Sequence, residues 1–288
     1  MQYLLSLLLL STYLFAIIQE PIHTTITAIN EDEEVISISP IQGAQVGMYG
    51  VIVQHFTNTH STALSWVEIT DIQADTISAK MIPIFALEQS ALPTGTWTAE
   101  IGDEVVLGYN YHRALLIAPN PSVYKKVTTY HHNRKWIHPD IFTTVLSSHG
   151  HPSPLVEDFQ YTCRANNIGL VSFVFDKSIV TVDCQSFKIV QNKTTSLTTD
   201  EIQLPFYTRV VNIEANWFGK GSDEMTEYSP YYISLLAENN PDNEWIQTYQ
   251  KIQEKEEDSW FASWFSDSEE SVEDEDATDT IEDTFEAD

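Results

Sequence analysis

The sequence predicts an α+β protein: a β-rich N-terminal module, built as a barrel or a sandwich, then a small α+β module and a disordered acidic C-terminal tail. Short apolar runs separated by tight turns predict the first module, and a continuous apolar run followed by helix signals predicts the second. The tail is predicted by its charge. With 42% hydrophobic residues, the 288-residue chain has enough apolar surface for a core.

The β-rich module is expected over residues 22–111. Apolar and polar residues alternate over residues 22–28, which is the period of a half-buried strand. Residues 64–72 and 76–84 flank a short polar turn and predict a hairpin. Five or six such strands with little helix favour a small barrel or sandwich.

The α+β module is expected over residues 113–240. Its apolar run at residues 114–118 is typical of a central strand covered on both faces. Residues 168–175 and 179–184 predict a further pair of strands, whereas residues 228–232 are expected in loops. Three helices are predicted from capping residues and first-turn prolines at Asn120-Pro121, Pro139-Asp140 and Ser153-Pro154.

The two cysteines, Cys163 and Cys184, are expected to form a structural disulfide. At helical spacing Cys163 shares an apolar face with Leu155 and Phe159, and Cys184 alternates onto the apolar face of its strand, so both point inward. A cysteine pair in an oxidising compartment is usually bridged. A redox or metal role is the alternative, but a redox pair usually has Cys-x-x-Cys spacing.

The first 16 residues predict export. Residues 1–16 form a leucine-rich run that is too short to span a bilayer comfortably, as in a secretory signal peptide. No Lys or Arg precedes this run, and Leu14 and Ala16 make an imperfect cleavage site, so an uncleaved leader is the alternative and the one expected membrane contact. Either version places the remaining chain in the periplasm, in the outer membrane or on the cell surface.

The chain is strongly acidic. It holds 14 Lys and Arg against 42 Asp and Glu, a formal net charge of -28 that repels phosphate backbones and anionic headgroups. Nucleic-acid binding is therefore excluded. Residues 251–288 carry half of this charge, with 16 acidic residues and two lysines. Over residues 241–288 we accordingly expect a short helix, from residue 244 to 257, and then a disordered tail.

The tail contains an aromatic patch. At helical spacing these residues share one face between acidic neighbours, and burying them against a partner would contribute several kcal/mol, as an order of magnitude. They predict a partner-docking segment, the alternative being that the segment packs on its own domain. The residues are Trp260, Phe261, Trp264 and Phe265.

No catalytic constellation follows from the sequence, which contains no Gly-x-Ser-x-Gly, Ser-x-x-Lys, phosphate-binding glycine loop or dinucleotide fingerprint. His149-Gly150-His151 would place two imidazoles on one ion, but it lacks the His-Glu-x-x-His spacing, so solvated loop histidines are expected. No catalytic residue, cofactor or metal ligand is assigned. A metal-dependent enzyme, the least favoured function, would use the clustered His131, His132, His138, His149 and His151, with Asp140 nearby.

Five segments occur in a specific order and spacing over about residues 1–240. They are Val46-Gly47-Met48-Tyr49-Gly50, Ala114-Leu115-Leu116-Ile117-Ala118-Pro119-Asn120 with Tyr124, Cys163 with Ile168-Gly169-Leu170-Val171, Cys184-Gln185-Ser186-Phe187-Lys188-Ile189, and Pro205-Phe206-Tyr207-Thr208-Arg209-Val210. No single segment is specific, but together they resemble the amino-terminal domain of the plasminogen-binding protein family of Helicobacter and related epsilon-class proteobacteria.

The resemblance implies an exported, non-enzymatic surface protein whose partner is host plasminogen. A family member ends in a Lys-rich region, whose cations suit the anionic, aromatic-lined lysine pockets of plasminogen kringles. This chain ends Glu286-Ala287-Asp288, which such a pocket repels. The alternative function is an envelope assembly or scaffold protein that docks a partner through its tail. Plasminogen binding would instead use internal cations such as Lys125, Lys126, Arg134 or Lys135.

Overall fold

The structure is a computed structural model that describes residues 20–84, 97–198 and 201–252. The expected leader at residues 1–16 lies outside these residues, as does the aromatic patch of the tail, Trp260, Phe261, Trp264 and Phe265. Among the helices in the described ranges, none is both long enough and apolar enough to cross a bilayer.

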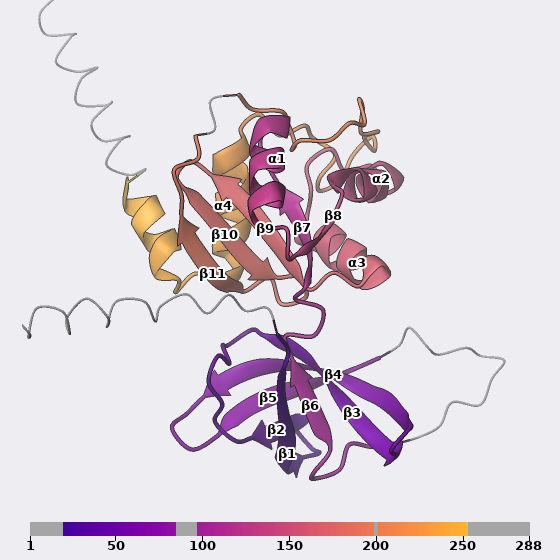
Figure 1. Cartoon of the computed structure of the whole chain (residues 1–288). Coiled ribbons are helices and arrows are strands. Elements are labelled where there is room, and N and C mark those ends of the chain that lie inside the picture. Colours follow the sequence, from indigo (N-terminus) through magenta and orange to yellow (C-terminus); the bar gives the residue numbers. More distant parts are fainter. Residues whose placement is uncertain (1–19, 85–96, 199–200, 253–288) are drawn as a thin grey trace, which may run out of the picture. The chain divides into compact units, whose positions relative to one another are not determined.

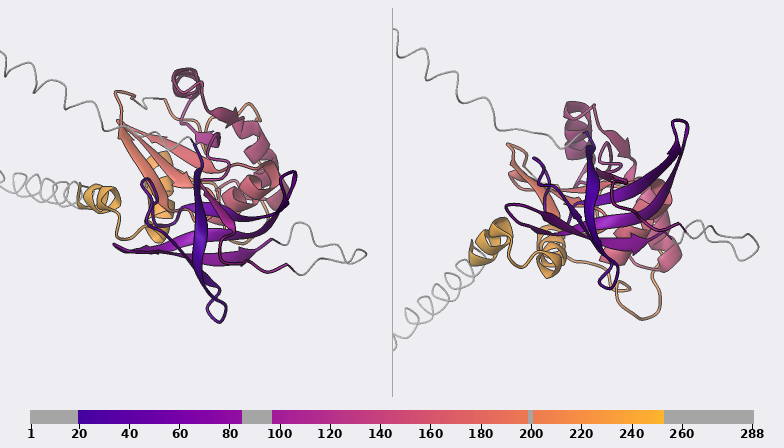
Figure 2. Two further views of the ribbon diagram at one scale, coloured as in Figure 1. Left: turned by 60° about the horizontal axis from the view of Figure 1, so that its bottom comes forward. Right: turned by 90° about the horizontal axis from the view of Figure 1, so that it is seen from below.

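Six antiparallel strands form a closed barrel in the order β1-β2-β5-β4-β3-β6 (Figures 1 and 2). The barrel closes because β6 pairs with both β1 and β3. Ile36, Ile52 and Ile69 are fully buried in its interior. The predicted β-rich module is therefore confirmed as a barrel. Its strands are β1 (Ile22–Asn30), β2 (Val35–Ile38), β3 (Tyr49–Thr57), β4 (His60–Ile72), β5 (Ile77–Pro83) and β6 (Glu104–Leu107).

The second module contains a five-stranded sheet in the order β11-β10-β9-β7-β8. Strand β7 is parallel to both β8 and β9, whereas β9, β10 and β11 pair antiparallel. The predicted central strand is confirmed as β7, in which residues 114–117 are all buried. The strands are β7 (Arg113–Ile117), β8 (Lys135–Ile137), β9 (Leu170–Phe175), β10 (Ser178–Asp183) and β11 (Ile189–Thr194).

Helices cover both faces of this sheet (Figure 1). On one face α1 packs through Val123 and Val127 onto Leu116 and Val174. The opposite face carries α2, α3 and α4 over an aromatic cluster, Phe142, Phe159, Phe173, Phe187, Phe206, Tyr228 and Tyr232. The helices are α1 (Pro121–Tyr130), α2 (Pro139–His149), α3 (Val156–Asn166) and α4 (Tyr228–Asn239).

The prediction of loops at residues 228–232 is wrong, because these residues begin α4. Tyr228 and Tyr232 lie one turn apart on its buried face, where their hydroxyls donate to the carbonyl oxygens of Ile117 (3.0 Å) and Pro205 (2.9 Å). No side chain caps the start of this helix. The local signals that mark α1 and α2 are therefore missing, and packing rather than capping stabilises α4.

The predicted disulfide is confirmed. Cys163 of α3 and Cys184, directly after β10, are bonded across a Cα–Cα distance of 6.2 Å. Both residues are buried, as their apolar faces predicted. The bond therefore ties one covering helix to the end of a sheet strand.

The fully buried carboxylate of Asp183 joins the sheet to the barrel. It accepts hydrogen bonds from the Tyr111 hydroxyl (2.8 Å) and from the backbone amides of Tyr49 (3.1 Å), Gln185 (2.8 Å) and Ser186 (3.1 Å). Burial raises the pKa of Asp183, although each of these donors acts to lower it. Four donors to one carboxylate explain how the group tolerates complete burial.

Within the described part of the chain, residues 241–252 belong to a unit separate from the residues before them. The helix predicted from residue 244 is present, and residues 244–252 are helical up to the end of the described range.

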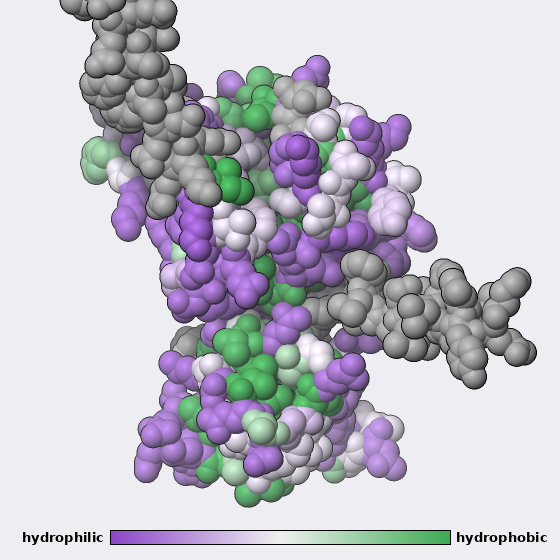
Figure 3. Space-filling view, turned by 90° about the vertical axis from the view of Figure 1, so that its left-hand side faces the viewer, coloured by the Kyte–Doolittle hydropathy of each residue, from purple (hydrophilic) through white to green (hydrophobic). Residues whose placement is uncertain are grey.

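Figure 3 shows mainly hydrophilic side chains on the viewed face, with hydrophobic side chains gathered on part of the barrel.

Candidate functional site

The carboxyl ends of the parallel strands meet at one edge of the second sheet. In open α/β sheets, ligands bind at such an edge where successive connections run to opposite sides of a strand. The order β8-β7-β9 creates this situation, because the chain leaves β7 through α1 to reach β8 and then passes through α2 and α3 to reach β9. This edge is the expected ligand position in a sheet of this kind.

Here, however, residues 203–209 lie across that edge. The backbone amide of Gln203 donates to the carbonyl of Pro119 (2.7 Å), and that of Tyr207 donates to the carbonyl of Ala118 (2.7 Å). The Tyr207 ring packs against Tyr124 of α1, with ring centroids 5.2 Å apart. The chain's own segment therefore covers the position that a ligand occupies in comparable sheets.

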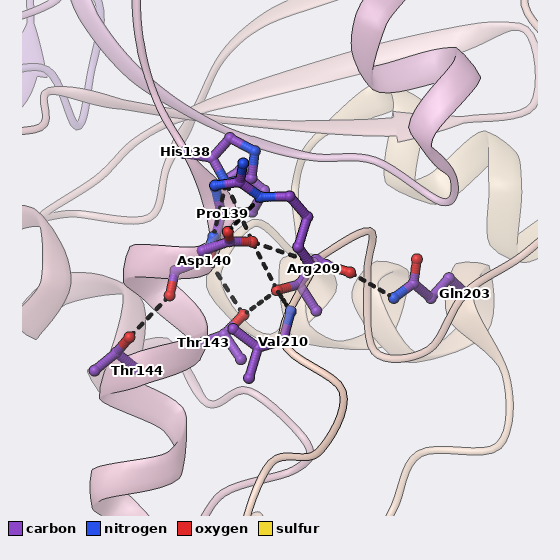
Figure 4. A network of polar contacts seen from close by, with 9 residues as sticks. His138, Pro139, Asp140, Thr143, Thr144, Gln203, Arg209 and Val210 are labelled. Atoms are coloured by element: carbon purple, nitrogen blue, oxygen red, sulfur yellow. Dashed lines mark hydrogen bonds and ion pairs between the residues drawn. The ribbon is translucent and has the colours of Figure 1, made fainter.

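An ion pair between Asp140 and Arg209 holds this segment (Figure 4). One oxygen of Asp140 accepts from the Thr208 hydroxyl (3.0 Å) and the Arg209 amide (2.9 Å), and the other accepts from Arg209 Nε (2.6 Å). Burial acts to raise the pKa of Asp140, but the hydrogen bonds from Arg209 and Thr208 outweigh it and hold that pKa below its usual value. We call this pair the Asp140–Arg209 clasp.

The helix starts at the same edge are capped by their own side chains. Asn120 Oδ1 accepts from the Val123 amide (2.8 Å) at the start of α1, and His138 Nδ1 accepts from the Asp140 amide (3.2 Å) at the start of α2. Phosphate-binding helix starts instead direct such amides at their ligand. The edge is therefore built as a closed structural contact.

Cations gather on α1 and on the strand beside it. Lys125 and Lys126 are exposed, and α1 contains no acidic residue. Lys193 of β11 places its ammonium 5.3 Å from the ring centroid of Tyr130, a side chain that is 74% exposed. Within the described part of the chain, neither Lys125 nor Lys126 forms an ion pair. We call Lys125, Lys126 and Lys193 the cationic face.

A shallow hollow of about 370 Å³ opens on the cationic face. Lys126, Lys193, Tyr130 and His131 contribute to its walls, and none of its lining residues is acidic. Burial lowers the pKa of His131, and the charges of Lys193 and Arg134 lower it further. The hollow is thus locally positive in a chain whose formal net charge is -28.

The four cations that the sequence suggested for partner binding differ in how exposed they are to solvent. Lys125, Lys126 and Lys135 are exposed. Arg134 is only 9% exposed and its guanidinium lies over the Trp136 ring, 5.9 Å from the centroid. Arg134 is therefore mainly a packing residue. Lys193, which the sequence analysis did not select, joins the face only because β11 lies beside α1.

A larger hollow of about 780 Å³ lies between the barrel and the second sheet. Its walls include Tyr49, Trp66, Tyr109 and Arg164, and the Trp66 and Tyr109 rings are 5.9 Å apart. Asp183 also borders this hollow, but it already accepts the four hydrogen bonds described above. The carboxylate of Asp183 therefore has a structural role.

The clustered histidines do not form one group. His131 lies at the cationic face and His138 caps α2. His149 and His151 contact the same carboxylate, that of Asp158 in α3. They are partly buried, with side chains 32% and 20% exposed, so the expectation of solvated loop histidines is wrong for this pair. Asp158 lies in the first turn of α3, and the sequence did not suggest it as a partner of these histidines.

Fold and surface together define a class of protein: a six-stranded barrel followed by a disulfide-linked α/β module, with its sheet edge closed and a cationic face exposed. The chain belongs to the family described as plasminogen-binding protein pgbA N-terminal, which matches residues 21–236. The resemblance noted in the sequence is thereby confirmed.

Two curated relatives, both named plasminogen-binding protein PgbA, come from two strains of Helicobacter pylori. Each is 26% identical to this chain over 223 residues, which are 76% of this chain and 48% of the relative. The chain thus spans about half the length of the curated relatives it matches.

Proposed function

We propose that this chain is an exported, non-enzymatic binding protein of the cell envelope or surface, and that plasminogen is its partner. The family and the name of its curated relatives support the partner. One structural observation carries the proposal: two adjacent lysines, Lys125 and Lys126, are exposed on an acid-free helix of a highly acidic protein.

An exposed ammonium on a flexible stem is the group that an anionic, aromatic-lined kringle pocket accepts. The net charge of -28 opposes approach to such a pocket. At physiological ionic strength, however, exposed charges are screened beyond roughly 8 Å, so nearby lysines dominate the interaction at contact. The cationic face therefore offers a binding surface that does not depend on the acidic tail.

The hydrogen bonds that two aspartates accept within the fold support binding rather than catalysis. Asp140 is the acidic group at the closed sheet edge, and Asp183 is the acidic group that borders the larger hollow. Asp140 accepts three hydrogen bonds from Thr208 and Arg209, and Asp183 accepts four. Groups engaged in this way hold the structure together and are poorly placed to exchange protons with a substrate.

The test is surface plasmon resonance of the full chain over immobilised plasminogen, with and without a lysine analogue. We expect binding that the analogue displaces, and at least about tenfold weaker affinity for Lys125→Gln with Lys126→Gln, a change of about 1.4 kcal/mol. The matched control, Lys177→Gln with Lys220→Gln, removes two exposed lysines elsewhere and should bind as the parent does.

Absence of analogue-sensitive binding would reject plasminogen as the partner. Equal weakening by the two lysine pairs would instead reject the cationic face as its site, because it would show a general effect of charge. Circular dichroism melting of each variant checks that the fold is retained.

A further inference from the structure

His149 and His151 converge on one carboxylate because of the turn between them. His149 ends α2, and Gly150 adopts a left-handed conformation (φ 71°) that reverses the chain. The amide of His151 then donates to the carbonyl of Leu146 (3.0 Å). Both imidazoles consequently face α3, where each Nδ1 contacts Asp158, His149 at 2.6 Å and His151 at 2.9 Å from its nearest oxygen.

The carboxylate of Asp158 is held in place by its own helix. Its side chain has no exposed surface, and one oxygen accepts from the Leu155 amide (2.9 Å) at the start of α3. This contact orients the other lone pairs toward the two histidines. Asp158 therefore resembles a ligating carboxylate whose position is set by a neighbouring hydrogen bond.

A second segment fixes the histidine loop from outside. The amide of Asn216 donates to the carbonyl of Gly150 (2.9 Å), and its side-chain nitrogen donates to the carbonyl of His149 (2.6 Å). A Cβ at position 150 would lie 2.4 Å from the Asn216 side chain, so glycine is required there for both its conformation and its size. The loop is thus preorganised by contacts that involve neither imidazole.

The surroundings favour a cation. Burial, together with the negative charges of Asp158, Glu238 and Glu157, raises the pKa of Tyr231 to about 12. The Tyr161 ring packs edge-on against His149 at a centroid distance of 5.1 Å and limits how far that ring can turn. Solvent still reaches the outer edges of both imidazoles.

We propose that His149, His151 and Asp158 form a three-ligand site for a divalent transition-metal ion, with Zn²⁺ as the best fit. Their ligand atoms all lie within 4.8 Å of one another. Imidazole nitrogen and carboxylate oxygen are both zinc ligands, and three protein ligands leave a fourth position for water or for a donor from a partner. Calcium and magnesium, which prefer oxygen ligands, should bind poorly.

The required movement is small. Ligands at about 2.0 to 2.1 Å around a tetrahedral ion lie roughly 3.3 Å apart. The present nitrogen–oxygen distances are 2.6 Å for His149 and 2.9 Å for His151. Each imidazole must therefore swing outward by about half an ångström, and its solvent-facing edge gives it room to do so.

The experiment is a calorimetric titration of the metal-stripped full chain with Zn²⁺, repeated with Ca²⁺ and Mg²⁺. We expect one saturable zinc site per chain above any weak binding to the acidic tail. His149→Gln with His151→Gln should weaken this site at least tenfold. The control His60→Gln with His132→Gln removes two exposed histidines elsewhere and should leave zinc binding unchanged.

Cobalt(II) supplies a second measurement, since a tetrahedral site with nitrogen ligands gives visible absorption bands that the double variant should lose. If the double variant fails to fold, His149→Gln alone carries the test. Lack of a one-to-one zinc phase, or the same zinc affinity in parent and variant, would overturn the proposal and leave a hydrogen-bonded His–Asp–His cluster. Plasminogen binding is measured separately at the cationic face, so either proposal can fail alone.

Discussion

Gly50 shows how single residues permit the barrel to close. A Cβ at this position would lie 2.6 Å from the carbonyl oxygen of Val106 and 3.0 Å from Leu107 Cα, both backbone atoms of β6. A larger residue would therefore separate β3 from β6, the strand that closes the barrel. Gly47 belongs to the same segment, residues 46–50, which resembles the plasminogen-binding family. It has a positive φ (82°) and lies against Lys188.

Glu104 strengthens the same closure by bridging the neighbours of β6. His23 of β1 and His55 of β3 lie 2.6 Å and 2.7 Å from its two carboxylate oxygens. The hydrogen bond from His55, and then that from His23, lowers the pKa of Glu104 below its usual value. A carboxyl with a lowered folded-state pKa stabilises the fold above its unfolded-state pKa, and this contribution is lost as the pH falls through the lowered value.

Glu104→Gln is therefore expected to reduce the free energy of unfolding by less than about 1 kcal/mol at neutral pH, since the group is partly exposed. The difference from the parent should shrink once the pH falls below the ordinary glutamate pKa of about 4.3. Urea unfolding across this range measures it, with Glu31→Gln, an exposed acid on the β1–β2 turn, as control. A difference that grows on acidification would contradict this assignment.

Among the elements, the segment at residues 203–209 depends most on long-range contacts. It contains no helix or strand, yet hydrogen bonds at both ends tie it to the edge of β7. The Asp140–Arg209 clasp joins residues 69 positions apart, and Phe206 inserts into the aromatic cluster below. A segment held in this way opens locally when its clasp is removed, while the sheet beneath keeps its core.

Arg209→Ala should accordingly lower the free energy of unfolding by roughly 0.5 to 1.5 kcal/mol. Hydrogen exchange at the amides of Gln203 and Tyr207 should accelerate, because both donate to the edge that the clasp covers. Arg164→Ala removes an exposed arginine of α3 and serves as control. Unchanged exchange at Tyr207 would show that Phe206 and Tyr207 hold the segment without the clasp.

For the whole molecule, charge is distributed unequally between the described modules and the tail. Residues 256–288 contain 15 acidic residues and no Lys or Arg. Removing them would change the formal net charge from -28 to -13 while leaving every lysine of the cationic face in place. Long-range repulsion of an anionic pocket should then weaken, whereas contacts at the face should remain.

Deletion of residues 256–288 is therefore predicted to preserve lysine-analogue-sensitive plasminogen binding and to increase its association rate at low salt. Stopped-flow measurements at two ionic strengths separate rate from affinity. Loss of partner binding on deletion would favour the alternative in which Trp260, Phe261, Trp264 and Phe265 dock the partner. That aromatic docking segment lies outside the described residues and stays a prediction.

Local signals allowed much of the fold to be predicted. Alternation along residues 22–28, the continuous run in β7, and the capping residue Asn120 each act over a few neighbours. The disulfide was predicted because each cysteine lies on the apolar face of its own helix or strand, together with neighbouring apolar residues. Of the candidate binding site, Lys125 and Lys126 were suggested as internal cations only through the resemblance to the plasminogen-binding family.

The sequence by itself determined the strands of the barrel, the central strand of the second sheet, the starts of α1 and α2 and the cysteine pair, because period and capping are properties of neighbouring residues. The start predicted at Ser153-Pro154 is wrong by two residues, since α3 begins at Val156 without a side-chain cap. Only the tertiary structure decided that Lys193 joins α1, that Arg134 is buried, that Asp158 meets His149 and His151, and that Tyr228 begins a helix. These depend on strand order and on packing between elements, which a local pattern does not encode.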